Sequence, residues 1–186
     1  GWFDGVERLQ PGSTITIGDH TSVSLWFFRN KGTSGEAMGL LKTGTYGDEN
    51  FRIFHKGNSI VINTYNEDII GSETQAHTIS TAAYTWTIGY NDGIAHTYAE
   101  GGITEISYFN DKLTASEFEE LYNNGLALNA LEHSQTANLV HYWRNDGLTT
   151  WTDLKGSNNL TGSMTQTMLI TAGVDSSRDS QGFLMN

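Results

Sequence analysis

The 186-residue chain contains no cysteine, a single proline and no run of about 18 apolar residues. Without cysteine it has no disulfide bonds and no thiolate metal ligands, so its fold must be held together by packing alone. Without a long apolar run, no segment can cross a membrane as a helix, and we expect no membrane insertion. The chain starts at Gly1 and Trp2 rather than at Met, which indicates a processed product, an excised domain or a start inside a longer polypeptide.

Basic residues are also scarce. Ten Lys and Arg stand against 21 Asp and Glu, which gives a net charge of −11. Nucleic-acid binding requires clustered Lys and Arg, and no basic stripe is present, so we predict no nucleic-acid partner. An acidic surface is typical of a well-solvated, exposed protein.

Calcium is an alternative explanation of the acidity, and calcium is the one cofactor that the sequence leaves open. Carboxylate and amide oxygens on loops are the ligands that this ion prefers. Three loop sequences offer them, and the weak metal candidates are Asp48, Asp92 and Asp111. Each also lies in an ordinary turn sequence, because Asn and Asp adopt turn conformations readily.

The 21 glycines, the abundance of Thr, Ser and Asn, and short apolar alternations are typical of many strands joined by turns. We predict strands over 14–17, 22–29 and 85–90, and a hairpin of 51–55 with 59–65. The length is that of one domain. The sequence therefore predicts an all-β fold, with two antiparallel sheets packed as a sandwich.

The stretch 103–125 is the most informative of the chain. Residues 104–110 alternate as a strand, and Thr114 and Glu117 then form a capping box that predicts a short helix over 114–123. Asn124-Gly125 predicts its end. We expect an apolar stripe to cover the sheet and two glutamates to face water; these are Phe118, Leu121 and Tyr122 for the stripe, and Glu119 and Glu120 for the exposed face.

This segment resembles the closing turn and helix of laminin-G-like (concanavalin A-like) jelly-roll domains, at Asn110, Leu113, Thr114, Glu117, Phe118, Leu121 and Tyr122. Phe3-Asp4-Gly5-Val6 and the strands at 15–18 and 23–28 are similar to the opening of the same family. Together the matches span about residues 3 to 125. The resemblance implies a concanavalin A-like jelly roll, as found in phage and bacterial surface proteins, and it identifies a fold rather than a ligand.

Two departures from the family pattern stand out. A pair of strands usual in the middle of such domains is not recognisable, and we hypothesise that residues are missing between about Gly71 and Ala76. Residues 139–159 resemble a segment that precedes the opening turn in relatives. We therefore divide the chain into a jelly roll over 1–133, a strand segment over 134–170 that completes the sandwich or starts a next repeat, and a polar arm over 171–186.

Catalytic patterns are absent from the sequence. Glycosidases of the related fold need two closely placed carboxylates, and Glu105 is the only carboxylate on its strand before the turn. The six histidines show no metal-ligand spacing, and no nucleophile motif is present. We predict that the chain is not an enzyme, which disfavours a concanavalin A-like glycosidase.

Binding is the expected class of function. Sugar recognition uses exposed aromatic rings, and the weak glycan-binding candidates are Trp151, Tyr46 and Tyr84, whereas we expect the core to hold Trp26, Trp86 and Trp143. The preferred interpretation is a structural or decoration module of a phage particle, which contacts other virion proteins or copies of itself on the capsid or tail surface and carries host-glycan adhesion as an added role. The alternative is a glycan-binding adhesion domain of a secreted or cell-surface bacterial protein.

Overall fold

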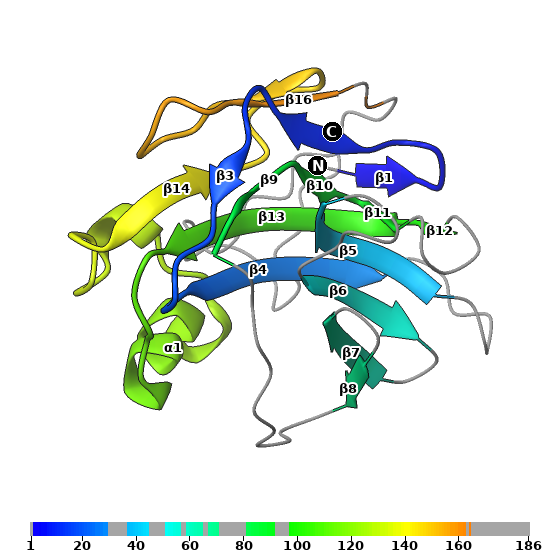
Figure 1. Ribbon diagram of the computed structural model, residues 1–186. Helices are drawn as coiled ribbons and strands as arrows, with labels where there is room; N and C mark the ends of the chain where they lie inside the picture. The colour runs from blue at the N-terminus through cyan, green and yellow to red at the C-terminus, as the bar shows by residue number, and fades with distance from the viewer. Residues whose placement is uncertain are drawn as a thin grey trace.

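The computed structural model describes residues 2–29, 37–44, 51–56, 59–64, 67–70, 81–91, 97–162 and 164. In this part of the chain, antiparallel strands form two main sheets, and one short α-helix lies at the end of the smaller sheet (Figure 1). The predicted all-β architecture of antiparallel sheets with one helix is confirmed. No helix among the described residues is long and apolar enough to cross a membrane.

Strand β13 is the centre of the smaller sheet. It pairs with β4 along one side and with both β1 and β14 along the other. Residues 100–102 of β13 face β1 and residues 106–109 face β14, so these two strands follow one another beside β13. The bounds are Trp2–Asp4 for β1, Ser22–Arg29 for β4, Glu100–Phe109 for β13 and Leu139–Trp143 for β14.

The larger sheet has the strand order β15-β16-β2-β10-β5-β6-β7-β8. Its strands are Thr150–Trp151, Leu160–Gly162, Leu9–Pro11, Trp86–Ile88, Ala37–Thr43, Phe51–Lys56, Ser59–Thr64 and Glu67–Ile70, in that order. Two short pairs complete the β structure: β3 (Ile15–Thr16) with β9 (Ala83–Tyr84), and β11 (Tyr90–Asn91) with β12 (Thr97–Tyr98). Strands from the C-terminal segment thus enter both sheets, β14 beside β13 and β16 beside β2.

The main core lies between the two sheets, and Trp86 of β10 is at its centre. The Trp86 ring centroid is 5.1 Å from that of Tyr108 on β13 and 6.5 Å from that of Trp143 on β14. All three side chains are buried. The two sheets are therefore joined by direct contacts between aromatic rings, which supply large buried areas in a chain without disulfide bonds.

The predicted strands are present with altered bounds; the strand predicted over 14–17 covers only Ile15–Thr16. The strand predicted from Thr104 begins earlier, at Glu100. The strand predicted over 85–90 is interrupted at Gly89, which has a φ of 80° and where a Cβ atom would lie 2.3 Å from the Phe3 ring. Only glycine fits this position, and the break separates β10 from β11. The hypothesised gap between Gly71 and Ala76 and the polar arm over 171–186 lie outside the described residues.

Candidate functional site

The connection between β13 and β14, residues 110–138, forms a lid on the outer face of the smaller sheet. It contains α1 (Ala115–Tyr122) and two 3-10 turns, η1 (Asn123–Gly125) and η2 (Ala130–Glu132). The lid closes a second core cluster, made of Phe109, Leu113, Leu121, Ala130, Leu139 and Tyr142. The lid thus buries the part of the outer sheet face that it covers.

The start of α1 follows the prediction. The Thr114 side chain accepts the N–H of Glu117, and the Glu117 carboxylate accepts the N–H of Thr114 at 2.6 Å. The N–H and the hydroxyl of Thr114 both donate to the Glu117 carboxylate and lower its pKa, the bond from the backbone most strongly. The helix ends at Asn123, which is left-handed with a φ of 42°, one residue before the predicted stop.

A buried histidine fastens the second half of the lid. His133 Nδ1 accepts the N–H of Gln135 at 3.0 Å, so its Nε2 carries the proton in the neutral ring and donates to the Glu117 carbonyl at 3.0 Å. Glu120 accepts the N–H and the hydroxyl of Ser134, and the hydroxyl bond is the main reason why the pKa of Glu120 is lowered. Glu120 was predicted to face water; its side chain is 35% exposed, and it also joins α1 to the turn that follows η2.

A bulge in β13 brings the carboxylate of Glu105 under the edge of the lid. No sequence motif identifies this residue as functional. The register of β13 against β4 shifts between Thr104 and Ser107, and Glu105 has a φ of 51°. The inserted residue lets both Thr104 and Glu105 point to the outer face, where a regular strand would place only one of them. The Thr104 hydroxyl is buried and has no hydrogen-bond partner among the described residues.

Glu105 forms a cluster with two side chains of the β14 region. Tyr142 donates its hydroxyl to one carboxylate oxygen, and Arg144 Nε donates to the other at 2.8 Å. Burial raises the pKa of Glu105, although both partners act to lower it. Burial also raises the pKa of Tyr142, with the Glu105 charge adding to the effect. For Arg144, burial acts to lower the pKa, but the Glu105 carboxylate outweighs it and the pKa is raised.

Beside this cluster, aromatic and apolar side chains reach the surface. Trp26 of β4 and Tyr122 at the end of α1 are stacked, with centroids 5.8 Å apart and planes 3° apart. Tyr122 is 55% exposed, Leu126 is 54% exposed and Phe118 is 40% exposed. We name Trp26, Phe118, Tyr122 and Leu126 the lid patch. Of the predicted helical stripe, only Leu121 is buried.

A second polar pair lies on the inner face of β14. Asp153 Oδ2 is 2.6 Å from His141 Nδ1, and its carboxylate accepts the N–H groups of Tyr142, Gly156 and Asn158. Burial acts to raise the pKa of Asp153, but these hydrogen bonds, led by that of His141, lower it to about 2. The pair therefore fixes the 153–158 loop against β14.

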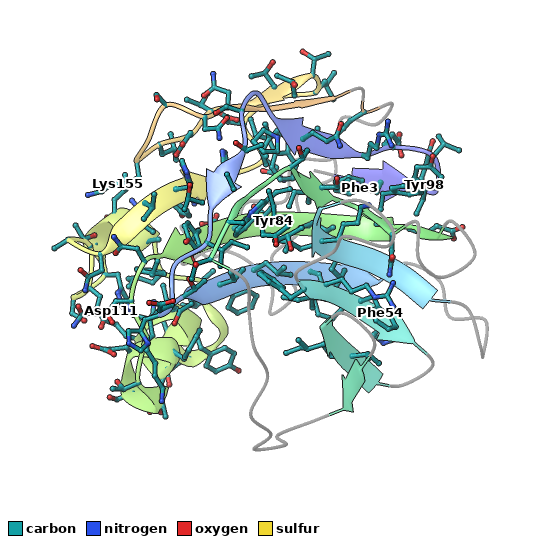
Figure 2. The ribbon with its side chains drawn as sticks, viewed as in Figure 1. Phe3, Phe54, Tyr84, Tyr98, Asp111 and Lys155 are labelled. Carbon is teal, nitrogen blue, oxygen red and sulfur yellow. The ribbon has the colours of Figure 1, made fainter. Side chains whose placement is uncertain are left out.

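Of the three predicted glycan residues, the structure describes Trp151 and Tyr84, and both pack in or against the main core. Trp151 is fully buried, with its ring against Phe3 and its indole N–H donated to the Gly147 carbonyl at 3.0 Å, so the prediction that it is exposed was wrong. Tyr84, labelled in Figure 2, is half-buried and packs against the main core. Tyr46 lies outside the described residues. Of the three tryptophans expected in the core, Trp26 is instead in the lid patch.

Of the predicted calcium ligands, the structure describes Asp111 alone. Asp48 and Asp92 lie outside the described residues. Asp111 is exposed at the start of the lid (Figure 2), where its carboxylate accepts the N–H of Lys112 at 2.7 Å and the amide of Asn138 at 3.2 Å. Within the described part of the chain, no group of three or more His, Asp or Glu side chains is arranged to hold a metal ion.

Comparisons with known proteins give no match: no family model, no curated protein and no solved structure is similar to this chain. The resemblance to laminin-G-like domains therefore depends on the sequence motifs alone. The lid patch, with the Glu105 cluster beneath its edge, is the candidate site that the geometry itself offers.

Proposed function

We propose that this chain is a non-enzymatic structural or decoration module of a virus particle, of the phage type, and that its lid patch contacts other virion proteins on the capsid or tail surface. The single observation that carries the proposal is the lid patch. Phe118 and Tyr122 lie one turn apart on α1 and are exposed, Trp26 stacks on the Tyr122 ring, and Leu126, also exposed, follows four residues later in the chain. Contiguous exposed apolar surface is a feature of interaction sites.

Two properties of the whole chain support a location on the surface of a virus particle. A cysteine-free, strongly acidic protein suits assembly in a reducing cytoplasm followed by exposure on a particle surface. A sandwich that completes its smaller sheet with strands from both ends of the chain suits a compact surface module. We propose a concanavalin A-like jelly roll as its topology, on the sequence motifs that resemble the laminin-G-like family.

The buried carboxylates favour a structural over a catalytic role. In the described part of the chain these are Glu7, Glu105 and Asp153. Glu7 accepts the N–H of Asp4 at 2.7 Å, and the other two are held by the partners given above. Glu105 and Asp153 bind different atoms of Tyr142, its hydroxyl and its N–H, whereas a glycosidase needs two carboxylates that face one substrate.

Glycan adhesion is the alternative function inferred from the sequence. The burial of Trp151 argues against it, because a buried ring cannot bind a sugar. A sugar-binding role would have to use Tyr122, which is 55% exposed and is followed in the chain by Asn123 and Asn124. The lid patch as a whole is more apolar than such a site requires, because Phe118 and Leu126 offer no polar group.

Electron microscopy of the native particle, together with mass spectrometry of the chain, tests the proposal. We expect the domain on the outer face of a capsid or tail lattice, with the lid patch covered by a neighbouring subunit. A matched pair of variants sharpens the test: Tyr122→Ser should reduce incorporation into the particle, whereas Leu154→Ser, at a 39% exposed site away from the lid, should not. A lattice in which the lid patch faces solvent would contradict the proposed contact.

A further inference from the structure

The segment that carries Phe118, Tyr122 and Leu126 has carboxylates but no Lys or Arg. Between Lys112 and Arg144 the sequence has no Lys or Arg, and it has four glutamates: Glu117, Glu119, Glu120 and Glu132. The hydrogen bonds of Glu117 and Glu120 lower the pKa of both groups, so these side chains stay ionised below the ordinary glutamate range. Glu119 is exposed, and its carboxylate has no hydrogen-bond partner among the described residues.

The end of α1 adds a further attraction for cations. A helix C-terminus carries partial negative charge on its free carbonyl groups, which Lys, Arg or His in the last turn normally offsets. The last turn of α1 has no basic residue, and Tyr122 is its final residue. The exposed ring of Tyr122 also presents a negative π face, to which guanidinium and ammonium groups bind. Glu119 lies one turn before Tyr122 and therefore next to it on the helix surface.

We propose that the lid patch binds a partner protein through a segment in which Lys or Arg side chains alternate with apolar ones. This inference depends on the proposed function, because it names the kind of partner that the same surface takes. The apolar residues of the partner cover Phe118 and Leu126. Its cationic side chains lie over the Tyr122 ring, near Glu119 and the carbonyl groups at the end of α1.

The charge distribution argues against a symmetric contact between two copies of this chain. In a twofold pairing through the lid patch, the Glu119 side chains and the helix ends of both copies would meet, and like charges at an interface are unfavourable. The net charge of −11 makes any contact between copies less favourable still. The partner that fits is therefore a different, basic protein segment.

Three synthetic peptides of equal length test the inference with the full chain: one alternates Arg with Leu, one alternates Glu with Leu and one alternates Ser with Leu. Binding is measured by tryptophan fluorescence and by NMR shifts of the Trp26 indole and the Tyr122 ring. We expect the Arg peptide to bind at the lid patch, and its affinity to fall as salt is raised.

Matched variants locate the interaction. Glu119→Lys should weaken binding of the Arg peptide by roughly three- to tenfold, because an attractive surface charge becomes repulsive. Tyr122→Ser should weaken it by about tenfold or more, because the ring supplies both apolar contact and the π face. Glu100→Lys is the control, since Glu100 is an exposed carboxylate at the opposite end of β13 and should leave binding unchanged.

The outcomes separate this inference from the proposed function. Equal binding of all three peptides at the lid patch would overturn the cationic partner and leave a protein-contact surface in place. If none of the three peptides binds, the cationic partner is also overturned. The proposed function would then still be tested by electron microscopy of the particle. Binding of neutral oligosaccharides at Tyr122 without any peptide would refute both. Sedimentation that shows dimers lost in Tyr122→Ser would replace the basic partner with a second copy.

Discussion

Replacing Arg144 by methionine should show how the Glu105 cluster supports the lid. The Glu105 carboxylate is buried, and Arg144 Nε is its only cationic partner among the described residues, at 2.8 Å. Arg144→Met keeps most of the side-chain volume but leaves a buried carboxylate held only by the Tyr142 hydroxyl. The variant thus removes one charge of a pair without opening a large cavity.

The size of the effect follows from burial. Removing one partner of a fully buried ion pair costs about 3–5 kcal/mol. The Arg144 side chain is 25% exposed, so water partly screens the pair, and we expect a loss of about 2–3 kcal/mol in the free energy of unfolding at neutral pH. Most of this cost arises from the ionised carboxylate rather than from the loss of packing.

The pH dependence gives the sharper test. The pKa of Glu105 is already raised in the folded protein, and without Arg144 it should rise further. A raised carboxyl pKa means that stability is greatest below the unfolded value of about 4.5 and is lost as pH increases through the folded value. Below pH 4.5 the carboxyl is protonated in both states, so the deficit of Arg144→Met should largely disappear there.

Urea unfolding at several pH values, followed by tryptophan fluorescence, measures these free energies. Lys112→Met is the control, because Lys112 is exposed and forms no ion pair within the described residues. The double variant with Glu105→Gln should recover part of the loss, since a neutral amide needs no cation. A deficit of the same size at pH 4 and pH 7 would refute the reasoning, as would no deficit at all.

Three further changes test the local structure by the same unfolding measurement. Asp153→Asn should cost about 1–3 kcal/mol at neutral pH; because the Asp153 pKa is lowered to about 2, the contribution should persist above pH 3.8 and fade only as pH falls toward 2. Thr114→Ala should cost about 1 kcal/mol through loss of the N-cap, with reduced protection of the α1 amides from hydrogen exchange. Gly89→Ala should cost several times more than Gly12→Ala, because its Cβ would meet the Phe3 ring at 2.3 Å, whereas at Gly12 the nearest atom is 3.8 Å away.

Features set by neighbouring residues could be predicted from the sequence. The capping box of Thr114 and Glu117 needs residues three positions apart and no information from the rest of the fold, and it is present as predicted. The strand of residues 22–29 likewise follows from its own alternation. The end of α1 was displaced by one residue because Asn123 itself adopts the left-handed conformation that Asn124-Gly125 was expected to provide.

Features set by distant contacts could not be predicted. Trp151 lies in a polar, threonine-rich stretch, yet pairing of β15 with β16 and contact with Phe3 bury it completely. Glu105 is the only carboxylate of the strand predicted from Thr104, but its burial depends on a bulge and on Arg144, which lies 39 residues further along the chain. A charged residue inside an apolar alternation is the only local signal of such a site, and it does not identify the partner.

The orientation of α1 determines what the lid can bind. A helix that buried all three apolar stripe residues would show mainly glutamates to solvent and would gain their full burial energy in the isolated chain. Because only Leu121 is buried, the 40% exposure of Phe118 and the 55% exposure of Tyr122 leave roughly 1 kcal/mol of burial free energy unrealised at each ring. A partner that covers both rings gains this amount, and the surrounding carboxylates then favour a basic segment over an acidic one. The incomplete packing of α1 on the sheet and the excess of carboxylates around the lid patch therefore act together, the first as a source of affinity and the second as a source of selectivity.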